Sequence, residues 1–158
     1  MQTDTIESKA QRYARMMEEA EAYVTTARPK IATASDAANL LRPMVKDATQ
    51  ETLYAILMDT RNMVISIMPV TTGLVDRSQA HAREVFREAI IQNSSRMVLV
   101  HNHPSGDPMP SAQDVECTRG LVSAGRIIGI EVMDHVVIGV ATKDRPRDYV
   151  SLRELNLM

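Results

Sequence analysis

The sequence has few aromatic residues and no excess of either charge. It contains no Trp, one Phe and four Tyr, which leaves few rings on which nucleic-acid bases could stack. The 18 Lys and Arg residues nearly balance the 20 Asp and Glu residues, and the formal net charge is -2 at pH 7. Because nucleic acids and anionic membranes attract strongly basic surfaces, this composition argues against autonomous binding to either partner.

Cysteine and long apolar runs are also scarce. Cys117 is the only cysteine of the chain, which excludes an intramolecular disulfide and a cysteine-based zinc site. The N-terminal residues lack the apolar core of a signal peptide, and no run approaches the ~20 apolar residues that a membrane-spanning helix needs. We therefore expect a cytoplasmic protein that does not enter the membrane. A length of 158 residues predicts one domain with a substantial core.

Apolar periodicity predicts helices that are interleaved with strands. Helices are expected at residues 4–28, 36–46, 79–93 and 112–126, and strands at 52–58, 63–70, 96–100, 132–140 and 149–152. Four turn-forming residues, 59–62, join the first two strands into an expected β-hairpin. This order of elements predicts an α/β protein in which helices flank a mixed β-sheet.

The ends and buried faces of the helices can also be predicted. Ser35 is expected to cap helix 36–46, and Pro43 to kink or shorten it. The side chains expected to face the core are Val85, Phe86, Ala89 and Ile90 in helix 79–93, and Val115, Leu121 and Val122 in helix 112–126.

The first expected helix carries a single apolar stripe. A helix of this kind packs either on its own domain or on a second copy of the chain. We therefore divide the chain into an N-terminal helical extension, residues 1–34, and a main domain, residues 35–158. The extension offers a contact through which a homodimer could form.

The stretch HNHPSGDPMPSAQD, residues 101–114, is the centre of the functional interpretation. His101 and His103 follow the apolar residues of a buried strand and project from the same face, because they are two residues apart. A Gly- and Pro-rich loop then leads to Ser111, where a helix is expected to begin, and Asp114 lies in its first turn. Two imidazoles and one carboxylate predict a three-ligand pocket with one open position, as in catalytic zinc sites.

A purely structural explanation competes with metal binding for each part of this stretch. A lone His-x-His pair more often satisfies local hydrogen bonds, and Ser111 with Asp114 has the spacing of a helix capping box. One carboxylate is not expected to serve a cap and a metal fully. Capping leaves the histidines unexplained, however, and polar groups at the end of so apolar a strand are costly without a purpose. We therefore favour metal binding.

A hydrolytic zinc site also needs a general base, which takes a proton from water and delivers it to the leaving amine. The upstream candidates are Glu51, Glu84 and Glu88. Glu51 begins the first strand of the hairpin and can border the pocket, whereas Glu84 and Glu88 suit the solvated face of a helix. The hydroxyl of Ser111 is the obvious donor to the oxyanion of a tetrahedral intermediate.

The spacing of these residues matches a known signature. The stretch reproduces, without a gap, the signature of the JAMM (MPN+, JAB) metalloprotease superfamily. That signature is read here as His101-x-His103-Pro104, six residues, Ser111, two residues and Asp114. The surrounding sequence resembles the RadC-like branch of that superfamily over about residues 35–155. The matching segments are Leu57–Asn62, Arg83–Phe86, His101–Asp107, Asp134–His135 and Tyr149–Glu154.

The resemblance implies a fold, a cofactor and roles for individual residues. The implied fold is the JAB/MPN fold, which is related to the architecture of cytidine deaminases, and it would make residues 35–158 a RadC-like JAB/MPN domain. The implied cofactor is Zn²⁺, held by His101, His103 and Asp114. The resemblance also implies that Ser111 stabilises the oxyanion and that Glu51 is the base.

Two further features bear on the resemblance. Asp134 and His135 match a residue pair of the family, and they either hold a turn by a hydrogen bond or support the zinc from behind its ligands. RadC-like proteins often carry an N-terminal helix-hairpin-helix region that binds DNA. Residues 1–34, with one expected helix, are too few for that module.

The leading functional hypothesis is a zinc-dependent metallopeptidase or isopeptidase that acts on an unidentified peptide or protein conjugate. One alternative is a non-catalytic, nucleic-acid-associated accessory protein, as the DNA-repair label of RadC-like proteins suggests. Another is a structural MPN scaffold module, although a scaffold does not need an intact set of ligands. A zinc deaminase is disfavoured because the sequence has no Pro-Cys-x-x-Cys ligand pair.

Overall fold

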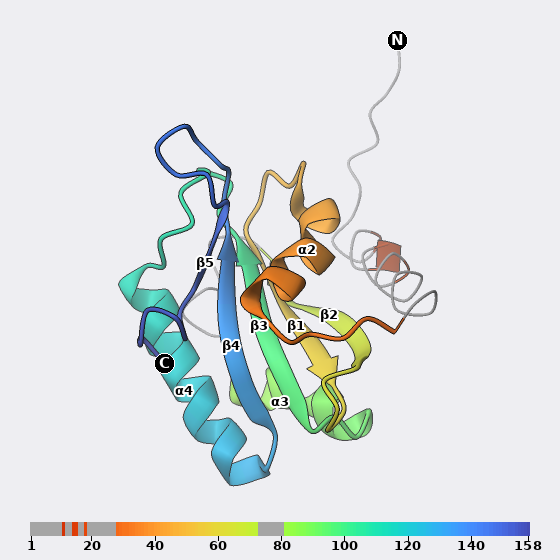
Figure 1. Ribbon diagram of the computed structural model, residues 1–158. Helices are drawn as coiled ribbons and strands as arrows, with labels where there is room; N and C mark the ends of the chain where they lie inside the picture. The colour runs from red at the N-terminus through yellow and green to blue at the C-terminus, as the bar shows by residue number, and fades with distance from the viewer. Residues whose placement is uncertain (1–10, 12–13, 16–17, 19–27, 73–80) are drawn as a thin grey trace.

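The central element of the structure is a five-stranded mixed β-sheet with the strand order β2-β1-β3-β4-β5 (Figure 1). The structure is a computed structural model that describes residues 11, 14–15, 18, 28–72 and 81–158. In chain order, its elements are α2 (Ala34–Val45), β1 (Thr52–Met58), β2 (Val64–Thr72), α3 (Ala82–Ile91), β3 (Arg96–Asn102), α4 (Ala112–Ile128), β4 (Glu131–Ile138) and β5 (Tyr149–Ser151). β3 and β4 are parallel and are joined by α4, whereas the other neighbouring strands are antiparallel.

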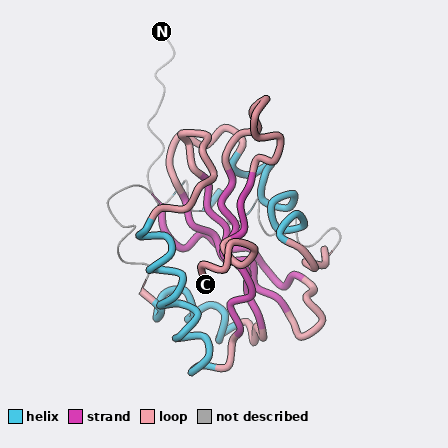
Figure 2. The backbone as a smooth tube through the Cα atoms, turned by 60° about the vertical axis from the view of Figure 1, so that its left-hand side comes forward, coloured by secondary structure: helices cyan, strands magenta, loops and turns pink. Residues whose placement is uncertain are grey.

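Helices cover both faces of the sheet, and Figure 2 shows the strand layer between them. Along β1, successive side chains alternate between the two faces. Ile56 belongs to the core under α2, which includes Leu41 of that helix. Leu57 belongs to the core on the other face, together with Phe86 of α3 and Leu121 of α4. The expected α/β fold, a mixed sheet flanked by helices, is therefore confirmed.

The β-hairpin forms where the turn residues predict it. The Asp59 carboxylate accepts hydrogen bonds from the backbone N–H groups of Arg61 (2.8 Å) and Met63 (3.0 Å). Asn62 has a left-handed backbone with φ of 63°, which asparagine tolerates better than most residues. The predicted turn residues, 59–62, thus supply both the hydrogen-bond acceptor and the backbone conformation of the turn.

The N-cap of α2 is Thr33, so the prediction that Ser35 caps this helix is wrong. The Thr33 hydroxyl accepts from the Asp36 N–H (3.2 Å), and the Asp36 carboxylate accepts from the Thr33 N–H (2.8 Å). This reciprocal capping box needs a carboxylate or amide side chain three residues after the cap, where Ser35 has only Ala38. The helix passes through Pro43 and ends two residues later, close to its expected end.

The buried faces of α3 and α4 agree with the predictions only in part. α3 buries Val85, Phe86 and Ala89. Ile90 is 58% exposed, because one residue beyond Ala89 the helix has turned a further ~100° away from the sheet. The deeply buried residues of α4 are Asp114, Thr118, Leu121 and Gly125. The expected Val115 and Val122 are half-buried, so the deepest stripe of α4 begins with two polar residues.

Most of the predicted helix at residues 4–28 lies outside the described residues. Of the five described residues within it, Gln11, Ala14, Arg15 and Glu18 are helical and Arg28 is not. The division at residue 34 and the dimer contact through the extension stay predictions. Lys30 already pairs with Met63 beside β2 in an isolated antiparallel bridge. In the part of the chain that the structure describes, no helix combines the length and apolarity needed to cross a membrane.

The loop after β3 is fixed against the end of β4. The His103 N–H donates to the Ile138 carbonyl (2.8 Å), and the Val140 N–H donates to the Gly106 carbonyl (2.8 Å). Gly139 lies so close to this loop that a Cβ atom there would be 2.3 Å from the Gly106 carbonyl oxygen. β4 ends two residues earlier than predicted, since the Gly139 N–H donates to the Asp148 carbonyl (2.6 Å) and the Val140 N–H to the loop.

Gly139→Ala is expected to destabilise the protein by about 1–3 kcal/mol, because the added methyl group must push the loop backbone aside. Gly120→Ala is the matched control: it lies on the exposed side of α4, and a Cβ there would meet no atom within 4 Å. The control should gain stability by about 0.5–1 kcal/mol from its better helix propensity. Urea unfolding of both variants measures the difference. A Gly139→Ala variant as stable as the wild type would contradict the close approach.

Candidate metal centre

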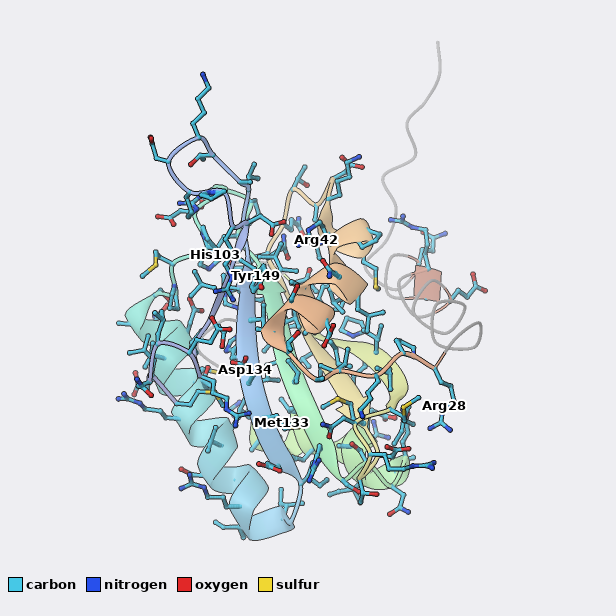
Figure 3. All side chains as sticks on the ribbon, in the orientation of Figure 1. Arg28, Arg42, His103, Met133, Asp134 and Tyr149 are labelled. Atoms are coloured by element: carbon cyan, nitrogen blue, oxygen red, sulfur yellow. The ribbon has the colours of Figure 1, made fainter. Side chains whose placement is uncertain are left out.

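β3 carries two histidines at the end of the sheet where several loops gather. His101 lies within β3, and His103 directly follows its last residue. Because side chains alternate along a strand, both point to the face covered by α4, and Asn102 between them points to the other face. Asn102 lines a cavity there with residues of α2 such as Val45. Figure 3 labels His103 at this end of the sheet.

Four side chains converge on one point beside the first turn of α4. They are Glu51, His101, His103 and Asp114, and one ligand atom of each lies within 4.8 Å of the others. The Nε2 atoms of the two histidines are 2.8 Å apart. Glu51 Oε1 lies 3.6 Å from Nε2 of His101 and 3.8 Å from Nε2 of His103. The structure therefore brings the three predicted zinc ligands together with the predicted base.

Glu51 reaches this point because of the register between β1 and β3. Leu53 lies opposite His101 in this antiparallel pair, so the same register carried two residues further places Glu51 opposite His103. Next to Glu51, the side chain of Asn102 makes the hydrogen bonds that a neighbouring strand's backbone would otherwise make. Its amide accepts from the Thr52 N–H (2.9 Å) and donates to the Gln50 carbonyl (3.0 Å). Asn102 thus holds the backbone on both sides of Glu51.

Asp114 reaches the same point from α4, whose N-cap is Ser111. The two residues form a capping box: Asp114 Oδ2 accepts from the Ser111 N–H (2.6 Å), and the Ser111 hydroxyl accepts from the Asp114 N–H (3.1 Å). Oδ1 and Oδ2 of Asp114 also lie 3.6 Å from Nε2 of His101 and His103, respectively. One carboxylate thus caps the helix and faces both histidines, because each of its oxygens has two lone pairs. Whether it can also serve a metal fully stays a prediction.

Ser111 combines its capping role with an unused hydrogen. In the cap its oxygen acts as acceptor. Among the described residues, the Ser111 hydroxyl accepts this hydrogen bond and donates none. A serine at this position can therefore cap α4 and still donate a hydrogen bond to another group.

The protonation of the cluster follows from its hydrogen bonds and burial. His103 Nδ1 lies 2.7 Å from the carbonyl oxygen of Asp107, which can only accept, so Nδ1 carries a hydrogen and Nε2 is the ring nitrogen that can bind a metal ion. Burial alone would raise the pKa of Asp114. The two imidazoles and the Ser111 N–H nevertheless hold that pKa well below its ordinary value, so the carboxylate is ionised.

A positive ion is the simplest partner for this group of atoms. The two Nε2 atoms face each other at hydrogen-bond distance, and Glu51 is 8% exposed. Lone pairs and buried carboxylates that converge in this way repel one another unless a proton or metal ion lies among them. Four ligand atoms about 2.0–2.2 Å from a zinc ion would be about 3.3–3.6 Å apart. The four separations between a carboxylate oxygen and an imidazole nitrogen are 3.6–3.8 Å, and the two Nε2 atoms lie closer together, at 2.8 Å. The residues therefore fit a divalent metal ion.

The predicted pair Asp134 and His135 divides between the two faces of the sheet. His135 lies against the cluster, with Nε2 2.7 Å from His101 Nδ1. Its burial, together with the nearby His101, lowers its pKa well below the ordinary value, so the ring is neutral. Asp134 instead lines a cavity on the face of α2, and Figure 3 shows it further along the sheet from the loops than His103.

Asp134 holds the C-terminal segment. Its carboxylate accepts from the Ser151 hydroxyl (2.7 Å), the Arg153 N–H (3.2 Å) and the His135 N–H (2.7 Å). Burial raises its pKa above the ordinary value, although these hydrogen bonds oppose the change. Among the described residues, the hydrogen bonds of the Asp134 carboxylate reach the metal centre only through the backbone N–H of His135. The Asp134 side chain makes no hydrogen bond to the four clustered side chains.

Comparisons with known proteins place this site in a family. The protein-family model of the RadC-like JAB domain matches residues 31–157 of the chain. The chain belongs to the RadC-like JAB domain family. A UPF0758 protein of Chloroflexus aurantiacus is 46% identical over 127 residues, which are 80% of this chain and 53% of the relative. UPF0758 proteins of Clostridium acetobutylicum and Methanococcoides burtonii are 38% and 40% identical, over 87% and 85% of this chain and 58% and 56% of their own length. The chain thus spans about half the length of the curated relatives it matches.

Two buried residues of this RadC-like JAB domain were missed by sequence reasoning. Thr118 is 0% exposed and contacts His135, and Asn102 is 4% exposed and brackets Glu51. Thr118 follows Asp114 by four residues, which puts it on the same helix face, so its position could have been noticed. The role of Asn102 depends on the pairing of β1 with β3, which the sequence does not state directly.

Proposed function

We propose that this RadC-like JAB domain is a zinc-dependent amide hydrolase of the metallopeptidase or isopeptidase type. The observation that carries the proposal is the convergence of two imidazole Nε2 atoms and two carboxylates from Glu51 and Asp114 within 4.8 Å. A mixed nitrogen and oxygen set with three protein ligands and one further position is typical of catalytic zinc. The substrate class is an unidentified peptide or protein conjugate.

The residues divide into those that hold the ion and those that move protons. His101, His103 and Asp114 would hold the zinc. When bound, zinc polarises an amide carbonyl and makes water a nucleophile near pH 7. Glu51 takes a proton from the attacking water as the C–O bond forms, and it gives that proton to the nitrogen as the C–N bond breaks. The free hydroxyl hydrogen of Ser111 donates to the oxyanion that develops on the carbonyl oxygen.

Burial and positioning support these roles for the side chains. Glu51 lies 3.6 and 3.8 Å from the two Nε2 atoms, and the Asn102 amide holds its backbone on both sides. A base with such a fixed backbone keeps its orientation through both proton transfers. The alternative base candidates on α3 differ: Glu84 is exposed, and Glu88 pairs with Arg87 at 3.7 Å.

Metal removal and restoration test the proposal. The purified chain is expected to carry about one zinc ion, measured by elemental mass spectrometry. A strong chelator should abolish the hydrolysis of peptides and isopeptide-linked conjugates in a substrate screen, and one equivalent of ZnCl₂ should restore it. The control is chelator that has been saturated with zinc before it is added.

Two results would count against this function. Wild-type protein that contains no zinc and binds none would contradict a zinc enzyme directly. Zinc-bound protein that cleaves nothing, but binds DNA in a salt-dependent way that survives chelation, would favour the nucleic-acid-associated accessory protein.

A further inference from the structure

Behind the metal centre, a line of buried hydrogen bonds runs from His101 to α4. His101 Nδ1 lies 2.7 Å from Nε2 of His135. Nδ1 of His135 lies 2.6 Å from Oγ1 of Thr118, and that hydroxyl lies 2.6 Å from the carbonyl oxygen of Asp114. His101, His135 and Thr118 are 2%, 3% and 0% exposed, so water does not compete for these bonds.

The carbonyl at the end of the line fixes the direction of every bond in it. A carbonyl oxygen only accepts, so the single hydroxyl hydrogen of Thr118 must go to Asp114. Thr118 Oγ1 then accepts from Nδ1–H of His135. Among the described residues, the ring of His135 hydrogen-bonds only to Thr118 and His101 and to no carboxylate, so it is neutral and its Nε2 is an acceptor.

The same argument then assigns the hydrogen of His101. Nδ1 of His101 must donate to Nε2 of His135, so in the neutral imidazole Nε2 of His101 is the nitrogen that keeps the lone pair. That atom is the one that faces His103, Glu51 and Asp114. The line of bonds therefore selects the tautomer of His101 that can bind a metal ion, and it does so from the side away from the metal.

We propose that Thr118 is a positioning residue for the metal centre: through His135, it fixes the tautomer and orientation of His101. This inference rests on the metal binding by His101 in the proposed function. Metal-binding histidines commonly donate their second N–H to a carboxylate or a backbone carbonyl. Here the acceptor is a neutral histidine, and its own tautomer depends on one hydroxyl group of α4.

The arrangement also joins two metal ligands to each other. Asp114 supplies its carboxylate to the cluster and its backbone carbonyl to Thr118, one turn further along α4. A shift of α4 would therefore move the carboxylate and, through Thr118 and His135, also release the imidazole of His101. The two ligands are held by the same helix, although His101 lies on β3.

Thr118→Val and Thr118→Ser form a matched pair for a test. Valine keeps the branched shape and removes the hydroxyl group, whereas serine keeps the hydroxyl group and removes a methyl group. Zinc affinity is measured by competition with a chromophoric chelator, so the readout does not depend on hydrolysis. Thr118→Val is expected to weaken zinc binding about 10- to 100-fold, and Thr118→Ser to stay within about threefold of the wild type.

The outcomes separate this inference from the proposed function. If the wild type does not bind zinc, the proposed function fails. If the wild type binds zinc and Thr118→Val binds it equally well, the positioning role fails. A loss of affinity of the same size in Thr118→Ser would assign the effect to packing, and that result would also overturn the role of the hydroxyl group.

A second measurement needs no variant and so does not depend on whether Thr118→Val folds. Long-range ¹H–¹⁵N NMR spectra distinguish protonated from bare ring nitrogens in the metal-free wild-type protein. His135 and His101 are both expected to show a protonated Nδ1 and a bare Nε2. A protonated Nε2 on His135 would reverse the direction of the bonds and overturn the proposal.

Discussion

Glu51→Gln is expected to abolish amide hydrolysis while the protein keeps its zinc. Glutamine has nearly the size of glutamate, but its side chain cannot take a proton from water. Loss of a general base in this position should lower kcat by about 10²–10⁴-fold. The measurement is kcat on whichever peptide or conjugate the substrate screen identifies, with the zinc content of the same sample determined by elemental mass spectrometry.

Glu84→Gln is the control for this variant. Glu84 is exposed on α3, and it is one of the alternative candidates for the base that precede the histidines in the chain. It should keep both its activity and its zinc. If Glu84→Gln lost activity and Glu51→Gln kept it, the assignment of the base would be wrong. If Glu51→Gln lost the zinc itself, Glu51 would be a fourth ligand and not a base.

Removal of two ligands together, His103→Ala with Asp114→Ala, is expected to reduce the zinc content from about one ion per chain to below about one tenth. Only His101 and Glu51 would remain, and two protein ligands do not hold zinc against a chelator. Thermal unfolding gives an independent readout. Zinc should raise the Tm of the metal-free wild type, because an ion that binds only the folded state stabilises it. It should leave the Tm of the double variant unchanged.

The comparison must use the zinc-induced change in Tm and not the Tm itself. Asp114 also belongs to the capping box of α4, and its loss costs about 1 kcal/mol without any metal. His81→Ala with Asp144→Ala removes the same residue types from two exposed positions and is the matched control. A double variant that kept one zinc ion per chain would place the metal site elsewhere.

The contiguous part of the site could be predicted because strand, loop and helix follow one another within fourteen residues. Alternation puts His101 and His103 on one face, and the helix start brings Asp114 back to it. Glu51 was harder, since fifty residues separate it from His101. The family resemblance named it, and the register of β1 with β3 explains it. Thr118 was missed because buried threonines in helices are common and need no partner outside the helix.

The fold was predictable where its determinants are local. The hairpin turn residues and the apolar runs specify neighbouring strands, so the alternating order of helices and strands was readable. The cap of α2 was misassigned because both Thr33 and Ser35 can accept from a backbone N–H, and only the carboxylate of Asp36 decides between them. The separation of Asp134 from His135 follows from strand alternation, which places neighbours on opposite faces.

The pairing of Leu53 with His101 has a consequence for how the protein reaches its native state. Glu51 approaches His103 only after β1 has paired with β3, and Asp114 approaches only after the first turn of α4 has formed beside the end of β3. Neither step alone completes the group of ligand atoms, because each contributes one carboxylate. The pairing of β1 with β3 joins residues far apart in the chain, and such pairings form slowly in comparison with single helices and hairpins. Tight metal binding would therefore be a property of the finished topology, and a chain that had folded only halfway would not yet compete for the ion.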